Sequence, residues 1–143
     1  MTSAATEVRE FSRIQKNSSP LRVLVVDDEA LIRWSVAETL TDSGYEVFEA
    51  ADGRSAVEAL GDGIAPIDVV LLDFRLPDSN DLGLLSRIRQ LSPKSQVILM
   101  TAYGTPEVAK GAIDLGVFRV VHKPFEMHEM AALVANAHAS RAH

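Results

Sequence analysis

The chain has 143 residues, 47% of them hydrophobic and 24% charged, with no cysteine and a formal net charge of −6. This size and balance are typical of one soluble globular domain, and the lack of cysteine excludes a disulfide framework and thiolate metal sites. The negative charge argues against direct nucleic-acid binding by this domain, because contacts to the phosphate backbone depend on lysine and arginine.

Residues 1–20 are expected to form an N-terminal arm or linker. The run EVREFSRIQK is compatible with a short helix, which NSSP then breaks. The arm lacks the apolar core of a secretory signal, and no run in the chain is apolar for long enough to span a membrane. We therefore expect a cytoplasmic protein without membrane contact, made of this arm, one domain over residues 21–140 and a tail at 141–143.

From Leu21 onward, short strand-like runs alternate with segments of helical period, in five β-then-α units. Four of the strand runs are continuously apolar, as is typical of strands buried on both faces of a parallel sheet. The pattern predicts an α/β fold, a (βα)5 doubly wound parallel sheet of five strands. The expected strands are 21–26, 45–50, 68–73, 95–100 and 117–122, and the expected helices are 31–40, 54–61, 82–91, 106–116 and 126–139.

Local signals mark where several of these helices begin and end. Thr105, Pro106 and Glu107 supply an N-cap, a proline at the first helical position and an acid in the first turn. Gly44 and Gly116 lie where two helices are expected to end.

Polar residues follow four of the strands. Asp27 and Asp28 follow the first strand, Asp73 ends the third, Thr101 follows the fourth, and Lys123 follows the fifth. In open α/β sheets, ligands bind beyond the carboxyl ends of the strands. Carboxylates gathered at such an edge repel each other by about 4 kcal/mol per pair at ~4 Å and an effective dielectric constant near 20. A cation among them would relieve this repulsion, and oxygen ligands favour a hard ion such as Mg²⁺.

Four motifs at the strand ends resemble the receiver domain of bacterial response regulators, the CheY-like family. The motifs are VLVVDDE, VVLLDFRLPD, ILMTAYG and VHKPF. The longer phrases LIRWSVAETL and TAYGTPEVAKGAIDLG are similar to receivers of NtrC-like transcriptional activators. The resemblance implies the strand order 2-1-3-4-5 of flavodoxin and CheY. It also implies a two-component signalling protein that accepts a phosphoryl group from a sensor histidine kinase or a phosphotransfer protein.

The resemblance also implies roles for the acids. Asp73 matches the phospho-acceptor, whose carboxylate attacks the phosphorus of a phosphohistidine. Asp28 matches the direct Mg²⁺ ligand and Asp27 the acid that orients a metal-bound water, while Asp73 and the backbone carbonyl of Arg75 complete the protein ligands. Glu29 is expected to be a solvated acid of the first helical turn. A simpler interpretation treats Asp73 and Asp28 as caps of a loop and of the helix near Ala30.

Thr101 and Lys123 complete the implied catalytic set. Thr101 is expected to donate its hydroxyl hydrogen to a phosphoryl oxygen. Lys123, before a cis-Pro124, is expected to pair with Asp73 and later with the phosphoryl group. A generic strand-end threonine and an exposed lysine are the simpler alternatives. The protein would not be an enzyme in the usual sense, because the only reactions it would catalyse are its own phosphorylation and dephosphorylation.

The sequence departs from the family pattern at two places. Asn80 and Asp81 stand where relatives usually have Asp-Gly, in a turn that often uses the conformational freedom of glycine. Val120 stands where the family usually has a tyrosine or phenylalanine that moves on activation. Tyr103 is our candidate to replace that aromatic switch.

The signalling face implied by the resemblance consists of the helix from Pro106, the strand from Val117 and the helix from Glu126. Two copies could pair there as a homodimer through complementary charges around an apolar patch. The main alternative is an interaction module of the same fold that does not switch, and a small hydrolase is a further alternative. The sequence has no GxxxxGK[ST] phosphate loop, and its acids would repel a flavin phosphate.

Overall fold

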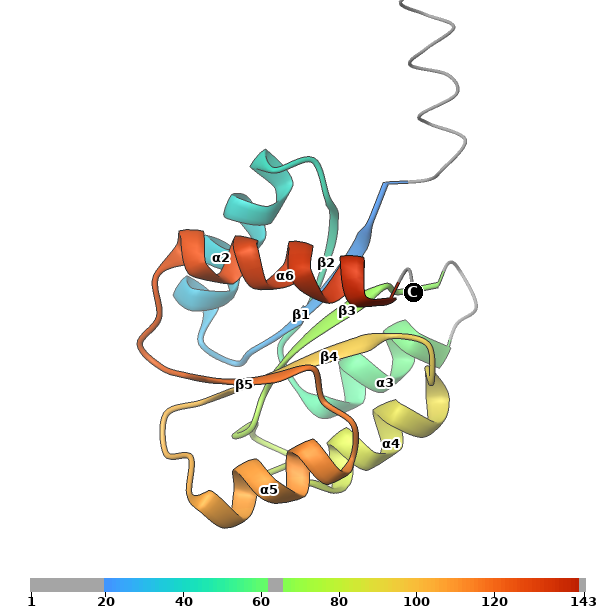
Figure 1. Ribbon diagram of the computed structural model, residues 1–143, viewed down its shortest axis with the longest axis vertical. Helices are drawn as coiled ribbons and strands as arrows, with labels where there is room; N and C mark the ends of the chain where they lie inside the picture. The colour runs from blue at the N-terminus through green and yellow to red at the C-terminus, as the bar shows by residue number, and fades with distance from the viewer. Residues whose placement is uncertain (1–19, 62–65, 142–143) are drawn as a thin grey trace, which may run out of the picture.

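The computed structural model describes residues 20–61 and 66–141. Residues 1–19 of the expected arm, and 142–143 of the expected tail, lie outside this range. Within it, five strands alternate with five helices (Figure 1). None of the described helices is long and apolar enough to cross a membrane. The strands are β1 (Arg22–Val26), β2 (Glu46–Ala50), β3 (Val69–Asp73), β4 (Gln96–Thr101) and β5 (Arg119–His122), and the helices are α2 (Ala30–Asp42), α3 (Gly53–Gly61), α4 (Gly83–Leu91), α5 (Pro106–Asp114) and α6 (Met127–Arg141).

All five strands pair in parallel, in the order β2-β1-β3-β4-β5. The predicted fold class and strand order are therefore confirmed. Helices α2 and α6 lie on one face of the sheet, and α3, α4 and α5 lie on the other (Figure 1). The carboxyl ends of all five strands consequently meet at one edge of the sheet.

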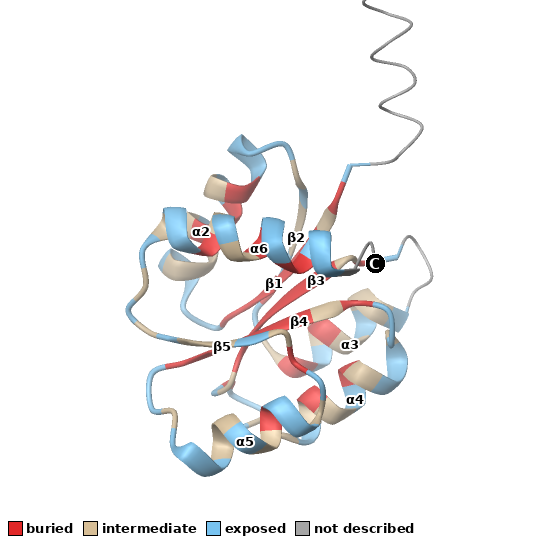
Figure 2. Ribbon diagram, in the orientation of Figure 1, coloured by how far each residue is buried: buried red, intermediate tan, exposed pale blue. Residues whose placement is uncertain are grey.

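Two hydrophobic clusters, one on each face of the sheet, form the core (Figure 2). Alternate residues of the central strands enter different clusters: Leu24, Leu72 and Leu99 pack toward one, and Val25, Leu71 and Ile98 pack toward the other. All six are at most 2% exposed. Burial on both faces explains why these strands read as continuous apolar runs.

The caps and boundaries agree with the sequence in most places. The Thr105 hydroxyl oxygen accepts a hydrogen bond from the Val108 N–H at 3.2 Å, as expected of the N-cap of α5. The fifth strand begins at Arg119, later than expected. The reason is that the Val117 N–H still donates to the carbonyl of Ala112 in the preceding helix, at 3.2 Å.

Gly44 and Gly116 end α2 and α5 with φ values of +95° and +90°. We expect Gly44→Ala to lower the free energy of unfolding by about 1 kcal/mol, because an L-residue is disfavoured in this left-handed region. Among the described residues, an added Cβ at Gly44 would meet no atom within 4 Å other than those of its chain neighbours, so the loss would come from the backbone alone.

Gly61→Ala is the matched control, because an added Cβ at Gly61 would also meet no non-neighbouring atom of the described residues within 4 Å, but Gly61 lies in α3 without a positive φ. Urea unfolding should show no loss of stability for this variant. Equal losses for the two variants would contradict the conformational explanation.

Candidate functional site

Four strands each place one candidate functional side chain at the carboxyl edge of the sheet. Asp27 follows β1, Asp73 ends β3, Thr101 ends β4 and Lys123 follows β5. The Lys123 N–H continues the β4–β5 ladder by donating to the Thr101 carbonyl at 2.9 Å. Asp27, Asp73 and Thr101 are 0%, 6% and 1% exposed, so the polar groups of the site lie beneath the surface.

The ammonium of Lys123 lies among three carboxylates. Its Nζ is 2.8 Å from Asp27 Oδ2, 3.2 Å from Asp73 Oδ2 and 3.2 Å from Glu29 Oε1. The expected contact with Asp73 is thus present, although the contact with Asp27 is shorter. The simpler interpretation of Lys123 as an exposed lysine is wrong, because its side chain is 9% exposed. The Lys123–Pro124 peptide bond is cis, as the resemblance implies.

Glu29 takes a different place from the one that we expected. It is the N-cap residue of α2, and its N–H donates to Asp27 Oδ1 at 2.9 Å. This local turn brings the Glu29 carboxylate to Lys123, although the side chain remains 59% exposed. The simpler interpretation of Asp28 as the cap of this helix is wrong, because the N-cap residue is Glu29, whose side chain makes no capping hydrogen bond.

Three carboxylates of the described residues have the spacing of a metal site. One oxygen from each of Asp27, Glu29 and Asp73 lies within 4.8 Å of the others. Hard oxygen ligands with a net negative charge fit Mg²⁺, and the Lys123 ammonium already places a positive charge among them. Asp28 is exposed and lies outside this cluster. Its role as a direct ligand therefore stays a prediction, and Glu29 is a member that sequence reasoning missed.

Burial raises the pKa of Asp73 from its ordinary value of 3.8 to about 6, with a further contribution from the neighbouring Asp27 charge. The charge and hydrogen bond of Lys123 act in the opposite direction without cancelling this rise. Burial by itself would lower the pKa of Lys123, but the hydrogen bond to Asp27 and the charges of Asp73 and Asp27 raise it overall. The Lys123 ammonium is therefore charged, and it lies next to the Asp73 carboxylate, whose pKa is raised.

Arg75 lies on the loop after β3, and Thr101 ends β4 just before the loop that carries Tyr103. The Thr101 hydroxyl oxygen accepts from the Tyr103 N–H at 3.1 Å, which leaves its own hydrogen available to a ligand. The Arg75 N–H lies 3.4 Å from Asp73 Oδ1. The guanidinium of Arg75 lies 5.0 Å from the centre of the exposed Tyr103 ring, so the two loops also meet through a cation–π contact.

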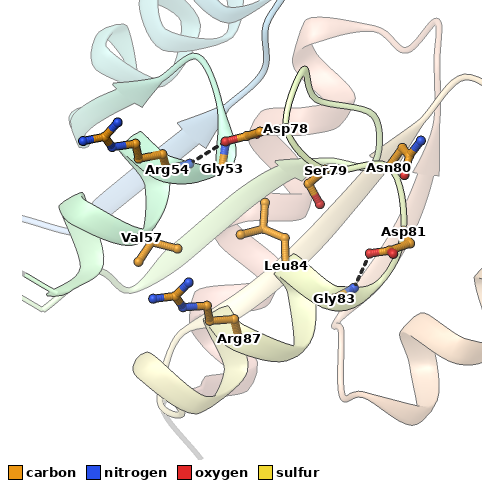
Figure 3. A pocket seen from close by; sticks show the side chains of 10 residues that line it. All are labelled: Gly53, Arg54, Val57, Asp78, Ser79, Asn80, Asp81, Gly83, Leu84 and Arg87. Carbon is orange, nitrogen blue, oxygen red and sulfur yellow. Dashed lines mark hydrogen bonds between the residues drawn. The ribbon is translucent and has the colours of Figure 1, made fainter.

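The turn with the unusual Asn80 and Asp81 forms without a left-handed residue, because no described residue other than glycine has a positive φ. Asp81 Oδ1 instead accepts from the Gly83 N–H at 2.8 Å at the start of α4 (Figure 3). Asp78 accepts from the N–H groups of Gly53 and Arg54 at 2.8 and 3.0 Å, which ties this loop to α3.

A groove of about 510 Å³ between α3 and α4 borders these residues. It does not include the carboxylate cluster, and its lining carries none of the predicted site residues.

Comparisons with known proteins agree with this geometry. A family model described as the response regulator receiver domain matches residues 23–135. The regulatory protein AtoC of Escherichia coli K12 is 38% identical over 81% of this chain and 25% of its own length. The chemotaxis protein CheY of Treponema pallidum is 31% identical over 84% of each chain.

Solved structures agree as well. The beryllofluoride-activated NtrC4 receiver domain dimer has a TM-score of 0.76 and 32% identity, over 84% of this chain and 98% of that chain. The chain spans about a quarter of the length of AtoC and of the Escherichia coli NtrC that it also matches.

The pKa of Asp73 makes stability depend on pH. A carboxylate whose pKa is higher in the folded state destabilises that state when ionised, so the cost begins near pH 3.8, is still small at pH 4 and is complete only above about pH 6. We expect Asp73→Asn to raise the free energy of unfolding by about 3 kcal/mol at pH 7.5 in EDTA, since a pKa difference of one corresponds to about 1.4 kcal/mol. Urea unfolding at pH 4 should show little difference from wild type. A constant difference at both pH values would contradict the assigned pKa.

Proposed function

This chain belongs to the response regulator receiver domain family, and from that premise we propose that it accepts a phosphoryl group on Asp73. The donor would be the phosphohistidine of a sensor histidine kinase or of a phosphotransfer protein. An oxygen of Asp73 would attack the phosphorus, the phosphorus–nitrogen bond would break, and the imidazole would leave with the bonding electrons. The observation that carries the proposal is the buried Asp73 carboxylate, which shares the Lys123 ammonium with the Asp27 carboxylate.

Lys123 and Thr101 supply the charge stabilisation for this step. The Lys123 ammonium is positioned to pair with phosphoryl oxygens once they are attached to Asp73. The Thr101 hydroxyl, at the end of the neighbouring strand, would donate to another of these oxygens. Phosphoryl transfer depends mainly on such positioning and electrostatic stabilisation.

Mg²⁺ is the cofactor that this donor set supports. The resemblance assigns Asp28, Asp73 and the Arg75 carbonyl as ligands and Asp27 as the acid that orients a bound water. The spacing of the acids adds Glu29 as a competing candidate for Asp28. When bound, Mg²⁺ would neutralise the carboxylates and the negative charge of the transferred group.

The protein would act in the cytoplasm as a signalling switch and not as an enzyme with a separate substrate. It would catalyse the formation and hydrolysis of its own aspartyl-phosphate. A constitutive interaction module of the same fold is the alternative, and the clustered Asp73, Thr101 and Lys123 favour the switch over it.

The proposed output face consists of α5, β5 and α6. A groove of about 530 Å³ on this face is lined by Arg119, Glu126 and Glu129 among others, and Ile113 on α5 is 62% exposed. The groove thus carries opposite charges beside apolar lining residues such as Leu133, which suits a symmetric homodimer. The dimer of the related NtrC4 receiver supports pairing as one use of such a domain.

The acceptor assignment is tested by labelling with acetyl phosphate and Mg²⁺, followed by intact mass measurement. Wild type should gain one phosphoryl group, whereas Asp73→Asn should gain none because the nucleophile is absent. EDTA should stop the labelling of wild type. Labelling of Asp73→Asn to the wild-type level would place the acceptor elsewhere.

The same assay separates the two candidate metal ligands. Asp28→Asn should slow labelling by at least about 10-fold, and Glu29→Gln should slow it much less, if Asp28 is the ligand as the resemblance implies. The reverse order would make Glu29 the ligand.

Assembly is tested by sedimentation with and without beryllofluoride, an acyl-phosphate mimic. We expect the mimic to shift wild type toward a dimer and Arg119→Glu to weaken that shift, because the charge at the proposed interface would be inverted. Arg54→Glu carries the same charge change as a control, because α3 contacts β2, at the opposite edge of the sheet from β5. Equal behaviour of both variants would argue against pairing through this face.

A further inference from the structure

The side chain of Arg33 joins α2 to the segment that carries the acids of the site. Its Nη1 donates to the backbone carbonyl of Asp27 at 2.7 Å, and its Nε donates to the Glu49 carboxylate on β2 at 3.1 Å. The Arg33 side chain is only 20% exposed. One guanidinium therefore connects a helix, a strand end and a neighbouring strand.

The backbone N–H, the backbone carbonyl and both carboxylate oxygens of Asp27 all form hydrogen bonds. Its N–H donates to the Ala50 carbonyl at 3.1 Å, its carbonyl accepts from Arg33, and its two carboxylate oxygens accept from the Glu29 N–H and the Lys123 ammonium. The carbonyl held by Arg33 belongs to the peptide group that links Asp27 to Asp28. Arg33 therefore fixes the direction in which the chain leaves β1 and enters the acidic segment.

Stabilisation of α2 does not explain an arginine at this position. Arg33 lies one turn into α2, where the helix dipole disfavours a positive charge. The partner carboxylate of Glu49 is 44% exposed, and ion pairs that exposed contribute little to stability. The short bond to the Asp27 carbonyl is the contact with a consequence for the site.

We propose that Arg33 is a positioning residue that holds Asp27 and Asp28 in the arrangement that binds a divalent cation. This inference rests on the proposed Mg²⁺-dependent function. Groups that orient metal ligands without touching the metal change its affinity by about 10- to 100-fold when they are removed. Arg33 reaches the ligand segment through the backbone, so it acts on the cation through Asp27 and Asp28.

Simple electrostatics predicts the opposite change in cation affinity when Arg33 is replaced. Removing one positive charge near a cluster of acids would, by Coulomb attraction alone, strengthen the binding of a cation. Positioning predicts weaker binding in spite of that gain. The direction of the change therefore separates the two explanations.

The test is the dissociation constant of Mg²⁺, measured by isothermal titration calorimetry on variants that circular dichroism shows to be folded. We expect Arg33→Gln to weaken binding by about 10-fold. Arg33→Lys should also weaken binding, because an ammonium keeps the charge but not the planar fork that reaches both acceptors. Glu49→Gln should have a smaller effect, since it leaves the bond to the Asp27 carbonyl in place.

Arg54→Gln is the matched control. Arg54 pairs with Glu58 at 3.3 Å on the surface of α3, and its side chain is 85% exposed, so this variant carries the same charge change away from the acids. Its Mg²⁺ affinity should equal that of wild type. Labelling of Arg33→Gln by acetyl phosphate should be slow at low Mg²⁺ and should recover at saturating Mg²⁺.

Unchanged or tighter Mg²⁺ binding by folded Arg33→Gln would overturn the inference while leaving the proposed function intact. If Arg33→Gln does not fold, wild-type Mg²⁺ affinity in Arg33→Lys would overturn the inference in the same way. Failure of wild type itself to bind Mg²⁺ would overturn both the metal-dependent function and the role of Arg33.

Discussion

The ammonium of Lys123 is the interaction on which the carboxyl edge of this sheet depends. Asp27 and Asp73 end neighbouring strands and are almost fully buried, so both would be costly without a compensating charge. Lys123 contacts both of them at hydrogen-bonding distance, and its side chain is only 9% exposed. Loss of the Lys123 charge would leave both acids without their buried partner, and a buried charge that loses its partner destabilises a fold by about 3–5 kcal/mol.

The fold was predictable because its signals are local and periodic. The apolar runs of β1, β3 and β4 correspond to strands that pack on both faces, and Thr105, Gly44 and Gly116 mark helix ends through backbone rules that need no tertiary knowledge. The start of β5 was less predictable. Val117 has the composition of a strand residue but still bonds to the end of α5.

The site was predictable to the extent that it follows from strand ends. Asp27, Asp73, Thr101 and Lys123 each lie at the end of a strand, and a parallel sheet brings such ends together whatever the side chains are. The position of Glu29 was not accessible in this way, because it depends on the turn closed by its N–H and the Asp27 carboxylate. The bond from Arg33 to a backbone carbonyl was equally hidden, since sequence patterns describe side chains and say little about which carbonyls they reach.

The lysine and its acids are far apart along the chain. The bonded pair Lys123–Asp27 is separated by 96 positions and the pair Lys123–Asp73 by 50. During synthesis from the N-terminus, β1 and β3 can pair well before the fifth strand leaves the ribosome, and their two carboxylates would then face each other without an ammonium. Until β5 adds to β4, these two carboxylates would repel each other without a compensating charge. Addition of the fifth strand therefore also completes the charge balance at the carboxyl edge.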